Sequence, residues 1–422
     1  MKEKLRAVGN FALVFFLFAV LFSFAMFQGG FTSWFLFFGF LPIFLYHFGL
    51  MLYPIHKWEV SRLLSHHVVR AGDGVTATIR VRRRVPFPLY YCICEEIFPD
   101  TLKKAEDRSN KYRWMNEPER QYRLREIKKV VFPAFRRVIE LPYRIEQIPR
   151  GEHQLRYVRI KTGDFFGFVK KEHVFQLDDQ LIAYPNEFPV RMGEVSSSYE
   201  QGSVASSALN LTNTNVATGI REYMPGDKVT WIDWKQTARK NEVMTKEFEQ
   251  EKSSNILLVL DAVPYKEMNG LAFEAAIEVT ISLMETIRRN FTQVGLVTIG
   301  EDIFHSPMQH SPGQREWVRQ HLTRIQPSGG QPFAIRLQEE MFKLGIGNIV
   351  IAVTTNLDEK LVVAAKKLRQ RTKRVSIVFI QSAGMITEKQ HAMMQQLRFE
   401  GVRVTVLTEK QLMKNPLEVG GI

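Results

Sequence analysis

The chain is poor in cysteine, with only Cys92 and Cys94 among its 422 residues. Two positions apart in an expected strand, these side chains point to the same face, which leaves no room for an ordinary disulfide bond. Two thiols are also too few ligands for a zinc site. We therefore expect buried free thiols, and the scarcity of cysteine fits a reducing compartment.

The chain also lacks a phosphate-binding loop, because no glycine-rich run ends in Gly-Lys-Ser or Gly-Lys-Thr. An intrinsic nucleotidase is therefore not expected. Acidic residues are not scarce, but basic residues outnumber them and give a formal net charge of +13. A net positive charge of this size can indicate binding to nucleic acid, to an anionic membrane surface or to an acidic partner. The positions of the basic residues along the chain distinguish among these partners.

Two long apolar stretches open the chain, at 7–27 and 31–53, with the polar break Gln28-Gly29-Gly30 between them. Each is long enough to cross the roughly 30 Å hydrocarbon core as a helix. A cleaved signal peptide is the competing interpretation of the first stretch, but a second apolar stretch follows at once and no small-residue cleavage pattern precedes it. We expect 1–56 to be a transmembrane hairpin.

Basic residues flank this hairpin on both sides, and the break between the stretches is uncharged. The flanking cations are Lys2, Lys4, Arg6, Lys57 and Arg62. Since positive charge is retained on the cytoplasmic side, both flanks should be cytoplasmic. This predicts a multi-pass plasma-membrane protein with cytoplasmic soluble domains.

Residues 57–190 show alternation in place of continuous apolar runs. In 75–82, for example, apolar side chains occupy every second position, as in a half-exposed strand. About seven short strands of this kind predict an immunoglobulin-like β-sandwich.

The sandwich region contains a basic insertion at 101–128. Its cations are Lys103, Lys104, Arg108, Lys111, Arg113, Arg120, Arg123 and Arg125, interleaved with Tyr112, Trp114 and Tyr122. Basic residues mixed with aromatic ones can bind nucleic acid. Next to a membrane anchor, a solvated loop or one on the anionic inner leaflet is favoured, since each nearby cation contributes about 1 kcal/mol there. We expect no nucleic-acid partner.

Residues 191–218 are rich in Ser, Thr and Asn and are expected to form a flexible linker. The segment that follows, 219–254, interleaves charged and aromatic residues, and its charges are stable in a half-buried network only if they are paired. Seven of its residues are predicted to form an interdomain or partner-binding network: Arg221, Tyr223, Asp227, Trp231, Asp233, Trp234 and Arg239.

One interpretation of this segment is structural. A turn around Pro225 would precede a helix whose start is capped by Asp227 or Thr230. Trp231 and Trp234, three residues apart, would then share one helix face.

Two functional interpretations remain open beside it. The segment could be a recognition surface, because Arg and Trp dominate interface hot spots and Asp233 could hold Arg239 in a bidentate pair. Alternatively, Asp227 or Asp233 could act as a catalytic acid or base. No His, Cys or Ser nucleophile pattern accompanies these carboxylates.

From 255 to 422, short apolar runs alternate with helical patterns. Continuous apolar runs are typical of strands buried on both faces, so we expect a doubly wound α/β domain with helices on each side of a parallel sheet. Ligands in such sheets bind at the carboxyl ends of strands near a change in strand order. Asp261, which closes the first strand, and Asn356, after the fourth, lie at such ends.

A family resemblance is carried by the segment 219–239. Its motif reads Gly219-Ile220-Arg221-Glu222-Tyr223, Pro225-Gly226-Asp227, Ile232-Asp233-Trp234 and Ala238-Arg239, with Pro149-Arg150-Gly151 and Gly163-Asp164-Phe165-Phe166-Gly167 upstream. These motifs resemble those of a bacterial group of membrane-anchored proteins, the domain-of-unknown-function family fifty-eight. The resemblance implies a von Willebrand factor A-like fold for 255–422. It also implies a MoxR-type AAA+ ATPase as partner, because such proteins are often encoded beside one.

Domains of the A type commonly bind a divalent metal through Asp-x-Ser-x-Ser after the first strand, with a Thr and an Asp from later loops. Here Asp261 keeps the first position, but Val263 and Tyr265 stand where the serines belong. Gln331 follows the Gly-Gly pair, and Asn356 lies near the late aspartate position. A hard cation prefers about six oxygen ligands and would find too few. We expect Asp261 to be a degenerate metal-site position, with no metal and no cofactor.

These observations predict a membrane-anchored, non-enzymatic interaction or adaptor protein. By resemblance, it would work with a MoxR-type ATPase in the assembly or maturation of envelope or other complexes. The alternatives are an envelope-associated enzyme using Asp227 or Asp233 and, more weakly, a nucleic-acid-binding protein using the basic insertion.

Overall fold

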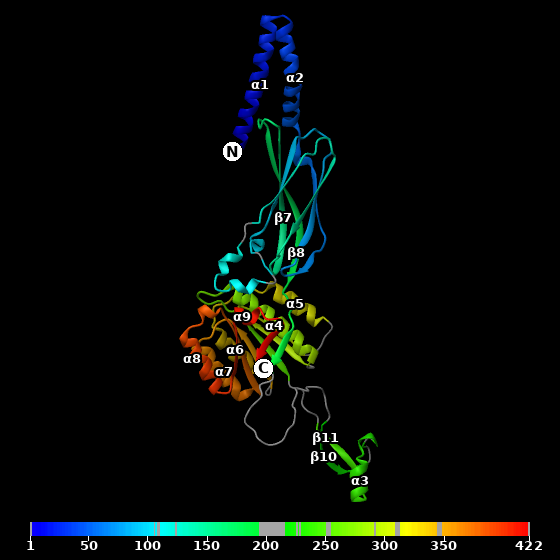
Figure 1. Ribbon diagram of the computed structural model, residues 1–422, viewed down its shortest axis with the longest axis vertical. Helices are drawn as coiled ribbons and strands as arrows, with labels where there is room; N and C mark the ends of the chain where they lie inside the picture. The colour runs from blue at the N-terminus through cyan, green and yellow to red at the C-terminus, as the bar shows by residue number, and fades with distance from the viewer. Residues whose placement is uncertain are drawn as a thin grey trace. The chain divides into compact units, whose positions relative to one another are not determined.

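The computed structural model describes residues 2–420 except 105, 108–109, 123–124, 194–215, 225–226, 228, 250–254, 291–292, 309–312 and 344–347. The chain divides into two compact units (Figure 1). The first comprises Met1–Arg108 and Arg120–Tyr184, and the second comprises Ser109–Glu119 and Pro185–Ile422. Most of the expected linker, 194–215, lies outside the described residues.

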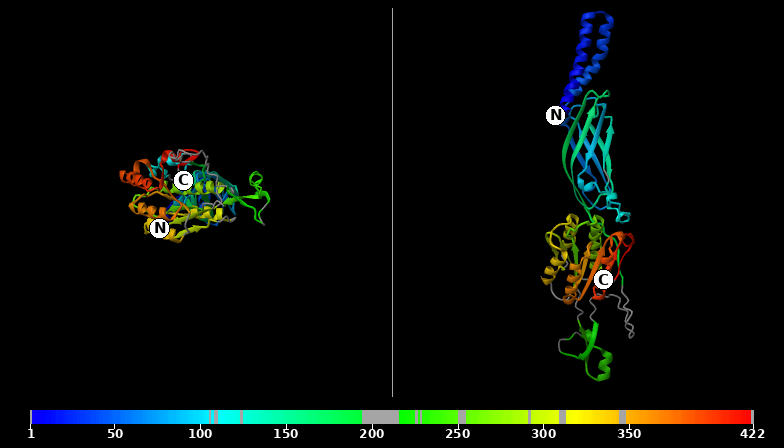
Figure 2. Two further views of the ribbon diagram at one scale, coloured as in Figure 1. Left: turned by 90° about the horizontal axis from the view of Figure 1, so that it is seen from below. Right: turned by 90° about the vertical axis from the view of Figure 1, so that its left-hand side faces the viewer.

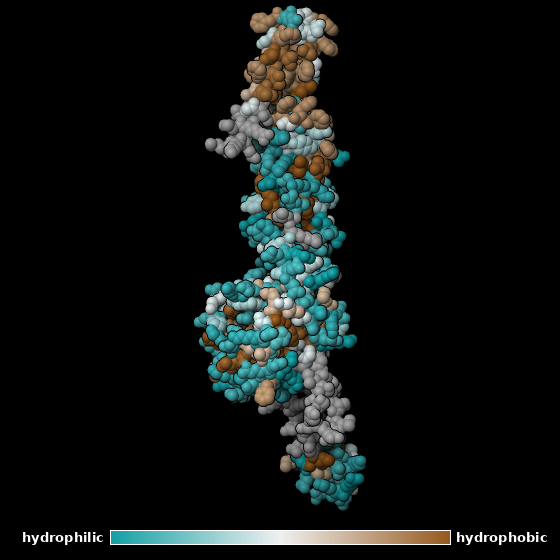
Figure 3. Space-filling model, turned by 60° about the vertical axis from the view of Figure 1, so that its left-hand side comes forward, coloured by the Kyte–Doolittle hydropathy of each residue, from teal (hydrophilic) through white to brown (hydrophobic). Residues whose placement is uncertain are grey.

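Two apolar helices open the first unit. Helix α1 spans Lys2–Gln28 and α2 spans Phe31–Leu52. Gly29 and Gly30 separate them with φ of 59° and 91°, a backbone that glycine adopts without strain. The helices contact each other through Phe18, whose ring lies 5.6 Å from that of Phe37. Figure 3 shows their hydrophobic surface in brown.

By length and composition, α2 is the one candidate membrane span among the described helices. The apolar part of α1, Ala12–Gln28, is shorter. The sequence predicts a hairpin of two membrane-spanning helices; one candidate span near the N-terminus has support, and the second span and the hairpin remain predictions.

The rest of the first unit consists of two β-sheets. Its strands are β1 (Glu59–Leu64), β2 (Val68–Arg70), β3 (Val75–Arg82), β4 (Tyr91–Ile97), β5 (Ile127–Val131), β6 (Val138–Ile145), β7 (Gly151–Gly163) and β8 (Lys170–Tyr184), with short 3-10 turns η1 (Ile55–Lys57), η2 (Asp100–Leu102) and η4 (Pro118–Gln121). One sheet has the order β1-β3-β6 and the other β2-β8-β7-β4-β5. Both contribute to a single core, which makes a two-layer β-sandwich.

Period-two alternation explains this core. Along β3 the burial pattern alternates strictly, so its apolar side chains all face inward. Cys92 and Cys94 of β4 also face the core as free thiols, as expected. Burial raises the pKa of Cys92 to about 12 and that of Cys94 further, so both thiols are protonated and unreactive.

The second unit is built on a six-stranded sheet. Its strands are β12 (Ile256–Asp261), β13 (Val294–Ile299), β14 (Ile303–Ser306), β15 (Ile349–Thr354), β16 (Arg374–Ile380) and β17 (Arg403–Leu407). The order is β14-β13-β12-β15-β16-β17, and every pair is parallel except that of β13 with β14. The continuous apolar runs correctly predict the parallel strands, whereas the short edge strand β14 is absent from the prediction.

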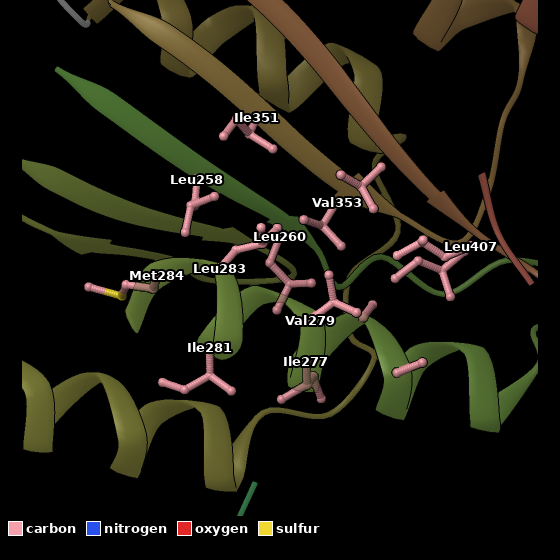
Figure 4. Close-up of a cluster of buried hydrophobic side chains, with 14 of the residues drawn as sticks. Leu258, Leu260, Ile277, Val279, Ile281, Leu283, Met284, Ile351, Val353 and Leu407 are labelled. Carbon is pink, nitrogen blue, oxygen red and sulfur yellow. The ribbon is translucent and has the colours of Figure 1, made fainter. Parts of the chain in front are cut away.

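Helices cover both faces of this sheet (Figures 1 and 2). They are α4 (Gly270–Asn290), α5 (Gln314–Arg324), α6 (Phe333–Lys343), α7 (Glu359–Arg371), α8 (Glu388–Phe399) and α9 (Glu409–Leu412), with the turn η6 (Ala383–Met385). Figure 4 shows Val279 of α4 beside Leu260 of β12 and Val353 of β15, whereas Ile277 lies on the other side of the helix. Helices α6, α7 and α8 pack on the opposite face.

Part of the basic insertion belongs to this second unit, contrary to the expectation of a loop in solvent or on the leaflet. The turn η3 (Lys111–Trp114) buries Tyr112, and the next residue, Met115, is fully buried in the same core. Lys111 Nζ lies 3.0 Å from Glu278 Oε1 of α4, and the Tyr112 hydroxyl donates to the same carboxylate. The free-energy cost of burying the Lys111 ammonium group is offset because its charge is paired.

Two short strand pairs complete the second unit. Strand β9 (Val190–Gly193) pairs in parallel with β18 (Leu417–Gly420). The first residues of the expected linker are therefore in a strand. Strand β10 (Val216–Glu222) pairs with β11 (Met244–Glu249) in an antiparallel ladder that carries the family motif.

Candidate functional site

A cavity of about 200 Å³ lies at the carboxyl edge of the parallel sheet. It is lined by Asp261, Val263, Pro264, Tyr265, Gly330, Pro332, Phe333, Ala334, Asn356, Asp358 and Leu361. Strands β12 and β15 are neighbours, but the chain runs outward from β12 to β13 on one side and onward from β15 to β16 on the other. This is the point where strand order reverses, and therefore the place where doubly wound sheets bind ligands.

Asp261 is the buried acid of this cavity, with 4% of its surface exposed. Its Oδ1 accepts from the Val263 backbone N–H at 3.0 Å, and its Oδ2 lies 2.7 Å from Thr354 Oγ1. Burial raises the pKa of Asp261 to about 7, although these two hydrogen bonds act in the opposite direction. The carboxyl group is therefore close to its titration point at neutral pH.

Thr354 connects this acid to β15. Its Oγ1 lies 2.7 Å from Asp261 Oδ2 and 2.9 Å from the Asn356 carbonyl oxygen, and it accepts from the Asn356 N–H at 3.0 Å. One hydroxyl proton serves one of the two oxygens. When Asp261 is protonated, it can donate to Thr354, which can then donate to Asn356. The site can thus hold a proton without losing a hydrogen bond.

Two other polar side chains of the cavity lining, those of Tyr265 and Asp358, already have protein partners. The Tyr265 hydroxyl donates to the Thr355 carbonyl oxygen at 3.0 Å, and Asp358 caps α7 by accepting from the Leu361 N–H at 2.7 Å. Gln331 accepts from Arg336 at 3.1 Å. Within the described part of the chain, no three His, Cys, Asp or Glu residues gather in a metal-binding group. The donors present fit a metal poorly, so the expectation of a metal-free site stands as a prediction.

The family motif forms a separate feature, which we call the motif hairpin, residues 216–249. It consists of β10, the turn η5 (Val229–Trp231), helix α3 (Trp234–Lys240) and β11. The Tyr223 N–H donates to the Val243 carbonyl oxygen at 2.9 Å, which extends the ladder beyond β10. Pro225 and Gly226 lie outside the described residues.

An ion pair closes the turn of this hairpin. The Arg221 guanidinium binds both oxygens of Asp227, at 2.8 and 2.7 Å, and the Met224 N–H donates to Asp227 at 3.0 Å. These hydrogen bonds, with that from Arg221 the largest influence, hold the pKa of Asp227 below its ordinary value. Two of the seven predicted network residues are thus partners.

The pairing of Asp233 with Arg239 is wrong. Asp233 instead caps α3, accepting from the Lys235 and Gln236 N–H groups at 3.1 and 3.2 Å. The sequence-based cap at Asp227 or Thr230 is wrong for the same reason, because the chain forms η5 before α3 begins at Trp234. Asp227 and Thr230 lie six and three residues before the actual N-cap, Asp233, which occupies the position next to the free N–H groups of the first helical turn.

The aromatic residues of the hairpin do not share one buried face. Trp231 is half-buried in η5, whereas Trp234 is 67% exposed at the start of α3. Tyr223 and Arg239 are also exposed. The exposed apolar side chains of the hairpin are Ile220, Tyr223, Met224, Val229, Trp234 and Val243.

The sequence points to Asp261 and Asn356 as cavity positions, and the structure places both there. It gives no weight to Thr354, the hydrogen-bond partner of Asp261. The available signal is its position as the last residue of the apolar run 349–354, at the carboxyl end of an expected strand.

Together, these features define a protein with an apolar N-terminal helix, a sheet-rich unit and an α/β unit. A family model described as "Protein of unknown function DUF58" matches residues 219–415. The uncharacterized protein YeaD of Bacillus subtilis (strain 168) is 34% identical over 346 residues, which is 81% of this chain and 81% of YeaD. The chain belongs to the DUF58 family, which confirms the family resemblance.

Solved structures give weak matches. Manganese-loaded TRAP protein of Plasmodium vivax is 16% identical, with a TM-score of 0.28, over 39% of this chain and 72% of its own. The PilB minor pilin of Streptococcus sanguinis is 8% identical, with a TM-score of 0.29, over 77% of this chain and 85% of its own. These scores are too low to support an argument about fold or function.

Proposed function

We propose that this DUF58 protein is a membrane-anchored, non-enzymatic interaction or adaptor protein. In this proposal α1 and α2 form a transmembrane hairpin, and both soluble units are cytoplasmic. The first unit is an immunoglobulin-like sandwich, and the second is a metal-free von Willebrand factor A-like domain. The partner is an AAA+ ATPase of MoxR type, with which the protein assembles or matures envelope or other complexes.

Membrane anchoring is supported by α2, whose 22 residues rise about 33 Å at 1.5 Å per residue. One of the five basic residues that flank the apolar stretches does not support the cytoplasmic orientation. Arg62 is buried in the sandwich, where it pairs with Glu96, so it does not count as a flanking charge. Lys2, Lys4 and Lys57 still support the cytoplasmic placement.

The observation that carries the interaction role is the exposure of large apolar side chains on the motif hairpin. Trp234 is 67% exposed, Val229 66% and Met224 61%. Large apolar residues exposed within one short segment are typical of interaction surfaces, and Trp is the residue type most enriched among interface hot spots. Because the family motif forms this hairpin, the surface is the part by which we propose the partner is bound. The MoxR-type identity of the partner rests on the family resemblance.

The catalytic alternatives have less support. Asp227 is held by Arg221 and Asp233 caps a helix, so each carboxylate has a role in shaping the hairpin. Neither lines the cavity at Asp261. For nucleic-acid binding, Lys111 and Tyr112 of the basic insertion are buried against Glu278 and are not available to a ligand.

The test is binding of the full-length protein in lipid nanodiscs to a purified MoxR-type ATPase from the same source, with and without ATP. Trp234→Ala should weaken binding at least about 30-fold, which corresponds to a hot-spot contribution of about 2 kcal/mol. Phe399→Ala is the matched control, because Phe399 of α8 is 93% exposed outside the hairpin.

Equal losses in both variants, or binding that Trp234→Ala leaves unchanged, would remove the hairpin as the binding surface. No binding by the folded wild-type protein would remove the ATPase as partner. A nucleic-acid role would instead appear as binding to mixed-sequence DNA or RNA that falls steeply with salt.

A further inference from the structure

Five exposed aromatic side chains gather where the sandwich of the first unit meets α2. They are Tyr90, Phe132, Phe165, Phe166 and Phe168, here called the aromatic collar. Their exposed fractions run from 38% at Phe168 to 67% at Phe165. They come from three connections of the sandwich: before β4, after β5 and between β7 and β8. Figure 3 shows further brown side chains on the end of the sandwich adjoining the helices.

The collar is continuous although its residues are far apart in sequence. The Tyr90 ring lies 5.1 Å from Phe165 and 5.8 Å from Phe132, and Phe165 lies 5.4 Å from Phe166. Phe166 in turn lies 6.0 Å from Phe168. Contiguous exposed aromatic surface of this kind is costly in water and marks a contact with an apolar partner.

Asp164 holds the central loop of the collar in place. Its carboxylate accepts from the N–H groups of Phe166, Phe168 and Val169, at 3.0, 3.2 and 2.6 Å. Gly167, with φ of 77°, lets the loop turn between the phenylalanines. The loop is therefore fixed with its apolar side chains outward.

Contacts with α2 set the level of the collar along the helix. His47 Nε2 lies 3.1 Å from Asp164 Oδ2, and the His47 ring lies 6.1 Å from Phe166 and 5.8 Å from Phe168. His47 precedes the end of α2 at Leu52 by five residues, or about 7.5 Å of helix rise. When α2 spans the bilayer, the collar must lie at the boundary between head groups and acyl chains.

Basic residues accompany the collar on the loop before β6 and at the start of β8. Arg136, Arg137 and Lys170 are exposed. Buried Arg83 fixes two of these loops together by donating to the carbonyl oxygens of Phe87 and Ala134, at 2.9 and 3.1 Å. Aromatic rings with nearby cations are the combination found at membrane interfaces and on anionic leaflets.

We propose that the aromatic collar inserts into the head-group region of the bilayer leaflet from which α2 emerges. The sandwich then contacts the membrane surface through three loops, in addition to its covalent connection to α2. The partner is the lipid bilayer itself. This inference rests on the membrane anchoring of the proposed function and adds the surface by which the first unit meets the lipid.

The test uses the full-length protein in vesicles of phosphatidylcholine and phosphatidylglycerol, labelled at single introduced cysteines with an environment-sensitive fluorophore. Cys92 and Cys94 are buried, so the wild-type protein should take no label. Phe166→Cys and Phe132→Cys probe two loops of the collar. Leu45→Cys, at a 63% exposed position of α2, probes the anchor, and Phe399→Cys is the control in the second unit.

The proposal predicts blue-shifted emission at both collar positions and quenching by lipids with a nitroxide near the head group. The probe at 45 should be quenched by nitroxides deep in the acyl chains, and the probe at 399 by aqueous iodide only. Iodide quenching at 166 and 132 as strong as at 399, with the probe at 45 still in lipid, would overturn the collar and leave the anchor intact. A probe at 45 that reports water would overturn both.

Discussion

Glu96 in the first unit and Asp261 in the second are both buried carboxylates, but their surroundings differ. Glu96 receives Arg62 at 2.6 Å and the Tyr143 hydroxyl at 2.7 Å. Arg62 also binds Asp179 at 2.8 Å. Asp261 receives only neutral donors, the Thr354 hydroxyl and the Val263 N–H.

The difference separates a carboxylate that is paired with a cation from a carboxyl group that lacks a counter-charge. In the network of Arg62, Glu96 and Asp179, each charge has a partner of opposite sign, so the network fixes how the two sheets pack and has no capacity left for a ligand. At the edge of the α/β sheet, an acid without a counter-charge is kept beside a cavity at a change of strand order. Perturbed acids in such positions are typical of functional sites.

The largest effect is expected from Arg62→Met, which leaves Glu96 buried without its counter-charge. The free energy of unfolding of the first unit should fall by about 3–5 kcal/mol. Hydrogen exchange of sandwich peptides in the detergent-solubilised full chain measures this loss. Arg80→Met is the matched control, because Arg80 pairs with Glu140 while both are 52% exposed, and it should cost at most about 1 kcal/mol. Equal losses in the two variants would contradict the comparison.

Asp261→Asn should have the opposite sign and depend on pH. Because burial raises the pKa of Asp261 to about 7, the folded state holds a proton that the unfolded state lacks between about pH 4 and 7. Wild-type stability therefore falls as pH rises through this window and levels off above it. At about 1.4 kcal/mol per pKa unit, the loss reaches up to about 4 kcal/mol.

The Asn variant cannot titrate, so it should be more stable than wild type at pH 8 and similar to it near pH 4. Hydrogen exchange of peptides from β12 and β15 at both pH values is the measurement. Thr354→Val is the control that removes the neighbouring hydroxyl and keeps the acid. A variant as pH-dependent as wild type would show that another group causes the dependence.

Two Tyr→Phe changes test whether a buried carboxylate that has a counter-charge contributes to stability in the same way in both units. Tyr143 donates to Glu96 in the first unit, and Tyr112 donates to Glu278 in the second, where Lys111 supplies the counter-charge. Each change should cost about 1–3 kcal/mol, the usual range for removing one partner of a buried hydrogen bond.

Similar losses in Tyr143→Phe and Tyr112→Phe, read by hydrogen exchange of their own units, would show that paired acids behave alike in both. A negligible loss at Tyr112 would mean that Lys111 alone is sufficient for Glu278, and the comparison would then rest on the ion pair.

The smallest effect is expected in the motif hairpin, where carboxylates are less buried. Asp233→Ala removes the cap of α3 and should destabilise that helix by about 1 kcal/mol. Exchange of the Lys235 and Gln236 amides should increase, while the core of the second unit is unchanged. Asp233→Asn retains a capping oxygen and should restore protection. If Asp233→Asn keeps the helix but abolishes a cellular function, the catalytic alternative gains support.

Local patterns in the sequence are sufficient for much of this architecture. The apolar run of α2, the alternation along β3 and the continuous runs of the parallel strands each follow from side-chain periodicity, which acts over neighbouring residues. The rule that ligands bind at carboxyl ends of strands also places Asp261 and Asn356 at the cavity. The family motif is likewise a property of the sequence.

Contacts between distant residues were decided only by the tertiary structure. Even at short range, the expected pair of Asp233 with Arg239 does not form, because η5 precedes α3 and leaves Asp233 at the N-cap of that helix. Tyr112 is buried in the second unit although the surrounding sequence belongs to the first. Thr354 of β15 contacts Asp261 of the neighbouring strand β12, although the two residues are 93 positions apart in the sequence. Such pairings depend on which surfaces the folded chain brings together, and no local pattern of residues encodes that.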